Sequence, residues 1–241
     1  MWIFKTAIPT FLDGYKPMQS IGVFDPSRNK KILITRPKHD ETTDHLYCWS
    51  KEVIDAASKK GLKVLDLSGD KATRYNLENM NFKMRPSFMF INGHGDYDKV
   101  CGHNNEVLIH SDDENDFENK IVYTLSCNSG KILGQSLVDN GVSAYMGYIE
   151  EFSFIVDTSC SCTPLKDEFA SAFKEASNII SISLIKGNSS KDAYKKSQEI
   201  FKKHISQFRR SDAPVGSEHI IFCLVWDMHH QILIGDEKVK I

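Results

Sequence analysis

Two short stretches of the chain end in side chains that can take part in nucleophilic or acid–base chemistry. In "FMFINGHG" (88–95), an apolar run leads to His94 between two glycines, and in "KIVYTLSCNSG" (120–130), a second apolar run leads to Cys127. A thiol is an effective nucleophile when it is ionised or has a base beside it, and histidine is the usual base. The pair predicts a thiol-dependent reaction, in which backbone N–H groups near Gly95 and Cys127 stabilise an oxyanion.

The elements that must position these side chains alternate along the chain. Apolar runs predict strands at 30–37, 62–69, 88–95, 120–127, 142–149 and 219–227, and helical spacing predicts helices over 46–57, 130–140, 163–180 and 189–205. Nearly continuous apolar strands separated by helices are typical of a mostly parallel sheet covered on both faces, so the fold class is α/β. Ligands bind beyond the carboxyl ends of such strands, where we expect His94 and Cys127.

Composition and charge limit the partners. The chain has 241 residues, of which 41% are hydrophobic and 26% charged, and a net charge of −2, which gives no reason to expect nucleic acid or an anionic membrane as a partner. No apolar run approaches the ~20 residues needed to span a bilayer. The first residues lack the basic lead of a signal peptide, so we expect a cytoplasmic protein.

The six cysteines are scattered, which is unlike a disulfide scaffold. Cys160-Ser161-Cys162 and Cys101-Gly102-His103 lack the spaced pairs of a structural zinc site. We therefore expect neither a metal nor another cofactor.

"INGHG" and "YTLSCNSG" resemble the His-Gly and Cys-x-Ser-Gly signatures of the caspase-like cysteine peptidases, the group that includes gingipains, clostripain and CHAT-domain proteases. The segment 99–109 is similar to the hairpin that lies between the two motifs in that group. The segment 134–152 is similar to the helix and strand that follow the nucleophile in gingipain-like and CHAT proteins. The resemblance covers about residues 30 to 230.

This resemblance implies a three-layer caspase-like sandwich over 30–241, with a mostly parallel six-stranded sheet and helices on both faces, preceded by an arm or edge strand at 1–29. It implies a cysteine endopeptidase with Cys127 as nucleophile, His94 as the residue that protonates the leaving amine, and N–H groups of Gly95 and Cys127 in the oxyanion hole. Leu125 stands where metacaspases often carry an acid, which disfavours that branch and its calcium dependence. The Gln-Ala-Cys of true caspases is absent as well.

Two alternatives remain open. The same fold could serve as a catalytically silent regulatory or partner-binding module. Another thiol hydrolase or amidotransferase is less favoured, because Ser126 and Asn128 do not provide a Gly-x-Cys-x-Gly elbow. Ser126 is a poorer nucleophile than the thiol beside it. The expected partners are a protein or peptide substrate and an activating or regulatory protein.

Two loops predict what such a peptidase would cut. The segments 35–46 and 147–157 are rich in acids, which favours cleavage after Arg, with Lys weaker, and Asp44 and Glu150 as the leading pocket acids. Arg36 could instead receive an Asp side chain. A polar segment at 206–219, expected between a helix and the last strand, is a candidate for processing after Arg209 or Arg210.

Overall fold

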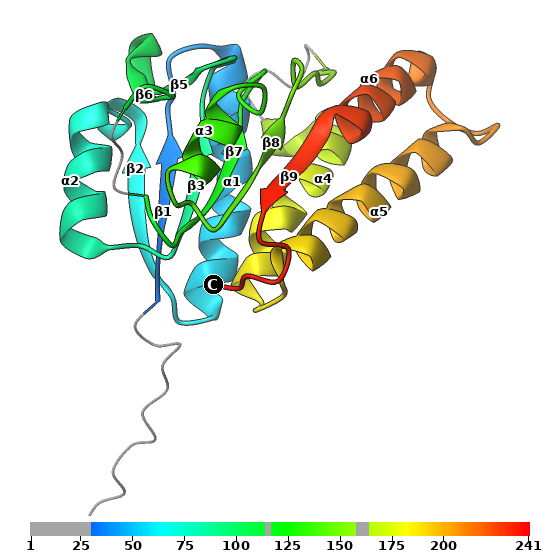
Figure 1. The fold of residues 1–241 in the computed structure, drawn as a ribbon. Coiled ribbons are helices and arrows are strands. Elements are labelled where there is room, and N and C mark those ends of the chain that lie inside the picture. The colour runs from blue at the N-terminus through cyan, green and yellow to red at the C-terminus, as the bar shows by residue number, and fades with distance from the viewer. Residues whose placement is uncertain (1–29, 114–116, 158–163) are drawn as a thin grey trace, which may run out of the picture.

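The computed structural model describes residues 30–113, 117–157 and 164–241. Its central feature is a six-stranded sheet in the order β2-β1-β3-β7-β8-β9, of which the first five strands are parallel and the last is antiparallel (Figure 1). The strands are β1 (Lys31–Arg36), β2 (Lys63–Ser68), β3 (Phe88–Asn92), β7 (Ile121–Leu125), β8 (Ala144–Tyr148) and β9 (Gln231–Gly235). A second, three-stranded sheet contains β4 (Gly95–Asp96), β5 (Lys99–Cys101) and β6 (Val107–His110).

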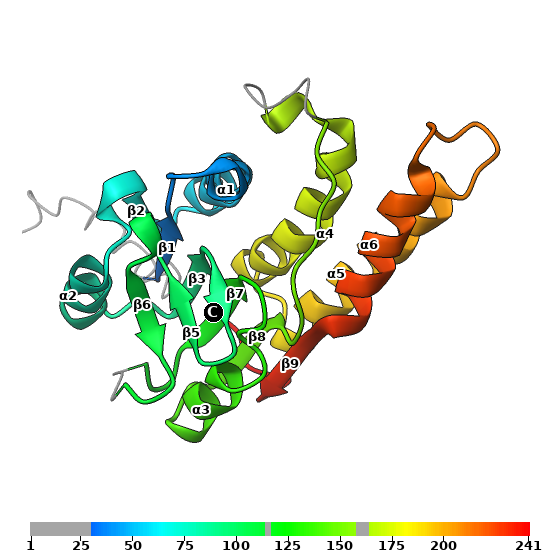
Figure 2. The ribbon, with the colours of Figure 1, turned by 90° about the horizontal axis from the view of Figure 1, so that it is seen from above.

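Helices cover both faces of the main sheet, as the α/β prediction requires. They are α1 (Glu41–Lys59), α2 (Arg74–Met84), α3 (Leu133–Asp139), α4 (Glu168–Ile185), α5 (Ser190–Phe208) and α6 (Ser217–His230). Figure 2, a view from above, shows the sheet between α1 and α4 on one side and α2 and α3 on the other. The fold is therefore a three-layer sandwich.

Alternation along the strands builds two separate cores. In β1, Ile32 and Ile34 pack in the cluster that contains α1, α4, α5 and α6, whereas Leu33 packs with α2, α3 and the small sheet. Successive side chains of a strand point to opposite faces, and here both faces are dry. That is why each strand reads as a continuous apolar run in the sequence.

Most predicted elements are present with small shifts of their ends. The strands expected at 30–37, 62–69, 88–95, 120–127 and 142–149 correspond to β1, β2, β3, β7 and β8. The resemblance-based hairpin over 99–109 is β5 and β6. Residues 1–29, predicted to be an arm or edge strand, lie outside the described residues.

The last predicted strand was wrong. Residues 219–227 lie in α6, and the sixth strand is β9, which follows directly and runs antiparallel to β8. The buried side chains Ile220, Leu224 and Asp227 recur at helical spacing, but apolar residues on the exposed side hide that period in the sequence. Consequently the segment around 209–216 joins two helices and does not join a helix to the last strand.

Two further helix predictions need correction. The helix α2 was not predicted, because its apolar face is weak. Its buried residues are Leu77 and Asn81, whereas the large side chains of Tyr75 and Phe82 are exposed. The helix α4 begins at Glu168 with Asp167 as its N-cap, rather than at the predicted start at 163. No helix among the described residues is long and apolar enough to cross a membrane.

Candidate active site

His94 and Cys127 follow two neighbouring parallel strands at the same level of the sheet. Strands β3 and β7 pair in a register that sets Asn92 opposite Leu125, and each candidate residue comes two positions later. The N–H of Gly93 donates to Leu125 O at 3.4 Å, which extends the contact one residue beyond β3. The structure thus brings both side chains to the carboxyl edge of the sheet, where open α/β sheets bind their ligands.

The backbone of Gly95 lies directly against Cys127. A Cβ atom at position 95 would stand 2.2 Å from Cys127 O and 3.0 Å from Cys127 N, so no larger residue fits without a backbone shift. Gly93 has a φ of 153°, and a Cβ there would stand 1.9 Å from Cys101 O. The two glycines of the first motif therefore serve close approach of backbone segments, one toward Cys127 and one toward the hairpin.

The thiol of Cys127 is half-buried. Its Sγ donates to Phe152 O at 3.9 Å. Burial is the largest cause that raises the pKa of the Cys127 thiol, and the nearby carboxylate of Glu151 acts in the same direction. A thiol in this environment needs a base to become a nucleophile at neutral pH.

A buried hydroxyl network holds the loop that carries Cys127. Ser129 Oγ lies 2.8 Å from Ser126 Oγ, 2.9 Å from Thr124 Oγ1 and 2.9 Å from the hydroxyl of Tyr145. The residue after the nucleophile candidate, Asn128, has a left-handed φ of 59°, which asparagine tolerates better than most side chains. Ser126 is 3% exposed and faces this network, so its hydroxyl does not reach the surface.

His94 is paired with the carboxylate of Asp40, which no sequence pattern connects to it. His94 Nε2 lies 2.6 Å from Asp40 Oδ2, and the His94 side chain is 37% exposed. The other carboxylate oxygen of Asp40 accepts from the N–H and the hydroxyl of Thr43, both at 2.8 Å, in the capping box that begins α1. The helix cap therefore fixes the carboxylate, and the carboxylate orients the imidazole.

The charge of Asp40 suits this task. Burial by itself raises the pKa of Asp40, but hydrogen bonds from the backbone and hydroxyl of Thr43 and from His94 outweigh it and lower the pKa to about 2. With Nε2 engaged by an ionised carboxylate, Nδ1 is the ring nitrogen of His94 that is left for chemistry. The two residues are 54 positions apart, so only the local Asp-x-x-Thr helix start was visible in the sequence.

The predicted pocket residues Asp44, Glu150 and Arg36 each form an ion pair, and they differ in how exposed that pair is. Glu150 is adjacent to the thiol loop, because Glu150 O accepts the N–H of Asn128 at 3.0 Å, and its carboxylate lies 2.8 Å from Lys131 Nζ. Asp44 is in the first turn of α1, 3.3 Å from Lys38 Nζ.

Arg36 is held away from solvent. Its guanidinium makes a two-point ion pair with Asp66, at 2.8 and 2.5 Å, and donates to Tyr47 O at 3.2 Å. The residue is 7% exposed. To meet a substrate, Arg36 would have to break its buried pair with Asp66. Asp44 and Glu150 would exchange only partly exposed pairs with lysines, which cost less to break.

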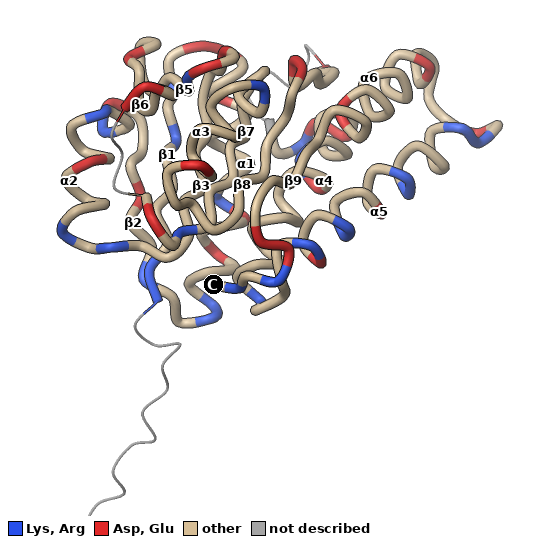
Figure 3. The backbone as a smooth tube through the Cα atoms, viewed as in Figure 1, with Lys and Arg blue, Asp and Glu red and all other residues tan. Residues whose placement is uncertain are grey.

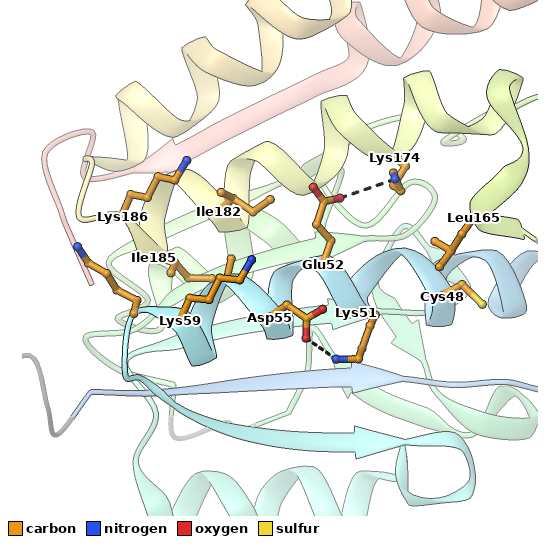
Figure 4. Close-up of a pocket in the computed structure, with 12 residues that line it drawn as sticks. Cys48, Lys51, Glu52, Asp55, Lys59, Leu165, Lys174, Ile182, Ile185 and Lys186 are labelled. Carbon is orange, nitrogen blue, oxygen red and sulfur yellow. Dashed lines mark hydrogen bonds and ion pairs between the residues drawn. The ribbon is translucent and has the colours of Figure 1, made fainter.

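A large groove lies elsewhere on the molecule. It has a volume of about 720 Å³ and runs between α1 and α4, with Ile182 and Ile185 in its wall and several lysines around it (Figure 4). Neither His94 nor Cys127 lines it. Figure 3 shows several acidic segments along the upper edge of the molecule, where the parallel strands end.

The remaining cysteines give no competing site among the described residues. Cys48, Cys101 and Cys223 are free thiols, and burial raises the pKa of each one. Cys160 and Cys162 lie outside the described residues.

No known protein-family profile matches the chain, and no curated protein matches it by sequence. The sheet order and the layers define a caspase-like α/β fold. Among solved structures, the chain is similar to the Arg-specific cysteine proteinase gingipain R (RgpB), with a TM-score of 0.59 and 9% identity over 88% of this chain and 47% of that chain. It is also similar to a complex of the Porphyromonas gingivalis RgpB pro- and mature domains, with a TM-score of 0.54 and 11% identity over 88% of this chain and 48% of that chain.

The chain therefore spans about half the length of the gingipain chains that it resembles. At these identities the likeness is one of fold. The roles of individual residues have to be argued from this chain's own geometry.

Proposed function

We propose that this protein is a cysteine endopeptidase with Cys127 as nucleophile and His94 as general acid and base. The observation that carries the proposal is the contact of the two motifs: Gly95 lies against the backbone of Cys127, at the ends of paired strands, next to a histidine that an ionised carboxylate orients. A structural histidine and a structural thiol have no need of this arrangement. Each part of it has a role in a Cys–His reaction.

The reaction would proceed in two stages. The imidazole of His94 takes the proton of the Cys127 thiol, and the thiolate attacks the carbonyl carbon of the scissile peptide bond. N–H groups of Gly95 and Cys127 stabilise the oxyanion, and His94 returns its proton to the leaving amine. Water then attacks the thioester, with His94 as base, and releases the acid product and the thiol. Asp40 stabilises the charged imidazole in both stages.

The first test uses a peptidyl probe that alkylates active-site thiols, together with turnover of a peptide library. We expect selective labelling of Cys127, and a loss of turnover of about a thousandfold or more in both Cys127→Ala and His94→Ala. Since the two residues act as one unit, the double variant should be little worse than either single variant.

Cys48→Ala is the matched control. It removes a different half-buried thiol, which lies on α1, and should leave turnover unchanged. Near-wild-type turnover in His94→Ala would remove histidine from the mechanism. Absence of both labelling and turnover in the wild-type protein would favour the silent regulatory module.

For the substrate, we propose cleavage after Arg, with Lys weaker, and Glu150 and Asp44 as the acids that receive the basic side chain. Each acid now pairs with a partly exposed lysine, an interaction worth about 1 kcal/mol or less, so a substrate guanidinium can replace it. A guanidinium also offers two parallel hydrogen bonds to a carboxylate, which an ammonium does not. The Arg specificity of gingipain R agrees with this choice but belongs to that protein.

Fluorogenic substrates that end in Arg, Lys, Asp or Leu test the preference. We expect the Arg substrate to be fastest, and Glu150→Gln or Asp44→Asn to lower kcat/KM for it about tenfold or more, which corresponds to the loss of one charge-assisted contact. Asp55→Asn, which changes an exposed acid of the same helix α1, is the control. Faster turnover of the Asp substrate would overturn the preference and point to Arg36.

A further inference from the structure

The side chain of His39 lies beside the Asp40–His94 pair, and the three together have the composition of a metal site. The ligand atoms of His39, Asp40 and His94 all lie within 4.8 Å of one another. His39 Nε2 is 3.5 Å from Asp40 Oδ2, and His94 Nε2 is 2.6 Å from the same oxygen. Two imidazole nitrogens and one carboxylate oxygen form a ligand set that Zn²⁺ and similar divalent ions prefer.

The spacing of the three atoms suits a tetrahedral ion. Ligands that each lie about 2.0–2.1 Å from zinc are about 3.4 Å apart at the tetrahedral angle. His39 Nε2 and Asp40 Oδ2 are near that spacing, at 3.5 Å. His94 Nε2 and Asp40 Oδ2 are closer, at 2.6 Å, because a hydrogen bond joins them. The ligand atoms of His39 and His94 are no more than 4.8 Å apart. Rotations of the three side chains would bring their ligand atoms to one ion, and a tetrahedral ion with three protein ligands has a fourth position for water.

The ligands are also held by their surroundings, as ligands of a metal usually are. Asp40 Oδ1 is fixed by the N–H and hydroxyl of Thr43, which leaves Oδ2 to face the two imidazoles. The ring of His39 is held edge-to-face between the rings of His94 and His103, with centroid distances of 5.8 and 5.4 Å. His39 and Asp40 sit at the start of α1, and His94 sits at the end of β3, so two rigid elements carry the set.

We propose that His39, Asp40 and His94 bind a Zn²⁺-type divalent cation that switches the peptidase off. Coordination takes the lone pair of His94 Nε2, so the single proton of the neutral ring resides on Nδ1. The ring then cannot accept the proton of the Cys127 thiol, and the metal also withdraws the carboxylate of Asp40 from its role beside the imidazole. The site itself does not depend on the proposed peptidase activity, whereas its inhibitory effect does.

Zinc binding is measured first on the full chain in the Cys127→Ala background, by calorimetry and by competition with a chromophoric chelator. We expect one ion per chain, and a loss of affinity of about a hundredfold in both His39→Gln and Asp40→Asn, because each variant removes one of three protein ligands. Asparagine still caps a helix, so Asp40→Asn removes the charge without removing the start of α1. His219→Gln, which changes an exposed histidine outside the cluster, should bind zinc like the parent.

Inhibition is measured next on the protein with Cys127 intact, with each variant compared with its own chelator-treated rate. Zinc should stop turnover in the wild type and in His219→Gln, and His39→Gln should need about a hundredfold more zinc for the same effect. Two binding results would overturn the ligand set. One is a His39→Gln protein that binds zinc as tightly as its parent. The other is a zinc site that the protein with Cys127 intact has and the Cys127→Ala protein lacks.

Two outcomes separate this proposal from the proposed function. If the Cys127→Ala protein binds zinc with the expected variant pattern but the wild type cleaves no peptide, the metal site stands and the peptidase fails. If the wild type cleaves peptides and zinc leaves its turnover unchanged, or raises it, the peptidase stands and the inhibitory site fails.

Discussion

Asp40 fixes the orientation of the His94 imidazole. An imidazole that is over a third exposed and has no partner would sample many orientations, but here a capped carboxylate holds its Nε2. In the proposed mechanism, the same carboxylate stabilises the imidazolium that would form when the thiol gives up its proton. Because burial raises the pKa of Cys127, that stabilisation is needed for the proton transfer.

Asp40→Asn should therefore lower kcat about a hundredfold while KM changes little. The amide oxygen can still cap α1, but the NH2 group that then faces His94 Nε2 can only donate, so the ring proton moves to Nδ1 and the charge beside the imidazole is lost. Steady-state kinetics in the presence of a chelator measures the effect, and thermal unfolding checks that α1 still forms. A variant with wild-type kcat would show that His94 works without Asp40.

Single residues also mark what a sequence can reveal about this site. The placement of His94 and Cys127 at the ends of neighbouring strands could be predicted because each motif is contiguous, with its strand, side chain and glycine adjacent in the chain. The partnership of His94 with Asp40 could not, because it depends on where α1 starts relative to β3 in space. Likewise, the pairing of Arg36 with Asp66 depends on the parallel register of β1 and β2, which no local pattern reveals.

Among the elements, α6 shows how local pattern and tertiary context compete. Its apolar run suits a strand, yet its buried residues recur every three or four positions and one of them is a carboxyl group, Asp227, with no exposed surface. Asp227 Oδ1 accepts the N–H of Ser153 at 2.9 Å, which ties α6 to the chain just beyond the active-site edge. No sequence pattern indicated that an acid would be buried there.

Asp227 gives a prediction about pH. Burial raises the pKa of Asp227 well above its ordinary value, so the folded chain keeps a proton that the unfolded chain loses near pH 4. Folding then binds a proton, and the free energy of unfolding falls as pH rises from the unfolded pKa toward the folded one.

In Asp227→Asn this fall should disappear, so the variant gains stability over the wild type as pH increases. The gain is about 1.4 kcal/mol for each unit by which the folded pKa exceeds the unfolded one, up to the folded pKa. Denaturant unfolding of both proteins at pH 4 and pH 8 measures it. Equal pH slopes in the two proteins would show that Asp227 is ionised in the fold.

At the scale of the whole molecule, the segment 209–216 is a connection that can be cut without breaking a described helix or strand. It joins α5 to α6, its residues Arg209 and Arg210 are exposed, and Val215 is fully exposed. A peptidase with the proposed basic preference should nick its own chain after Arg209 or Arg210.

We expect aged wild-type protein to show this nick by mass spectrometry and Cys127→Ala to stay intact. The two pieces should still migrate together in native conditions, because β9 pairs with β8 along five residue positions and α6 packs on α5. A wild-type chain that stays whole, or a nick that also forms in Cys127→Ala, would contradict self-cleavage.

The antiparallel direction of β9 has a topological consequence. Gly235 lies opposite Ala144, at the amino end of β8, so β9 leads to the side of the sheet where the parallel strands begin. There Lys30 Nζ donates to Ile241 O at 2.5 Å. Residues 30 and 241 are therefore close to each other on the side opposite the edge that carries His94 and Cys127. In a chain without residues 1–29, a short linker from residue 241 to residue 30 and new ends at 209–216 would give a circular permutant with the same sheet order.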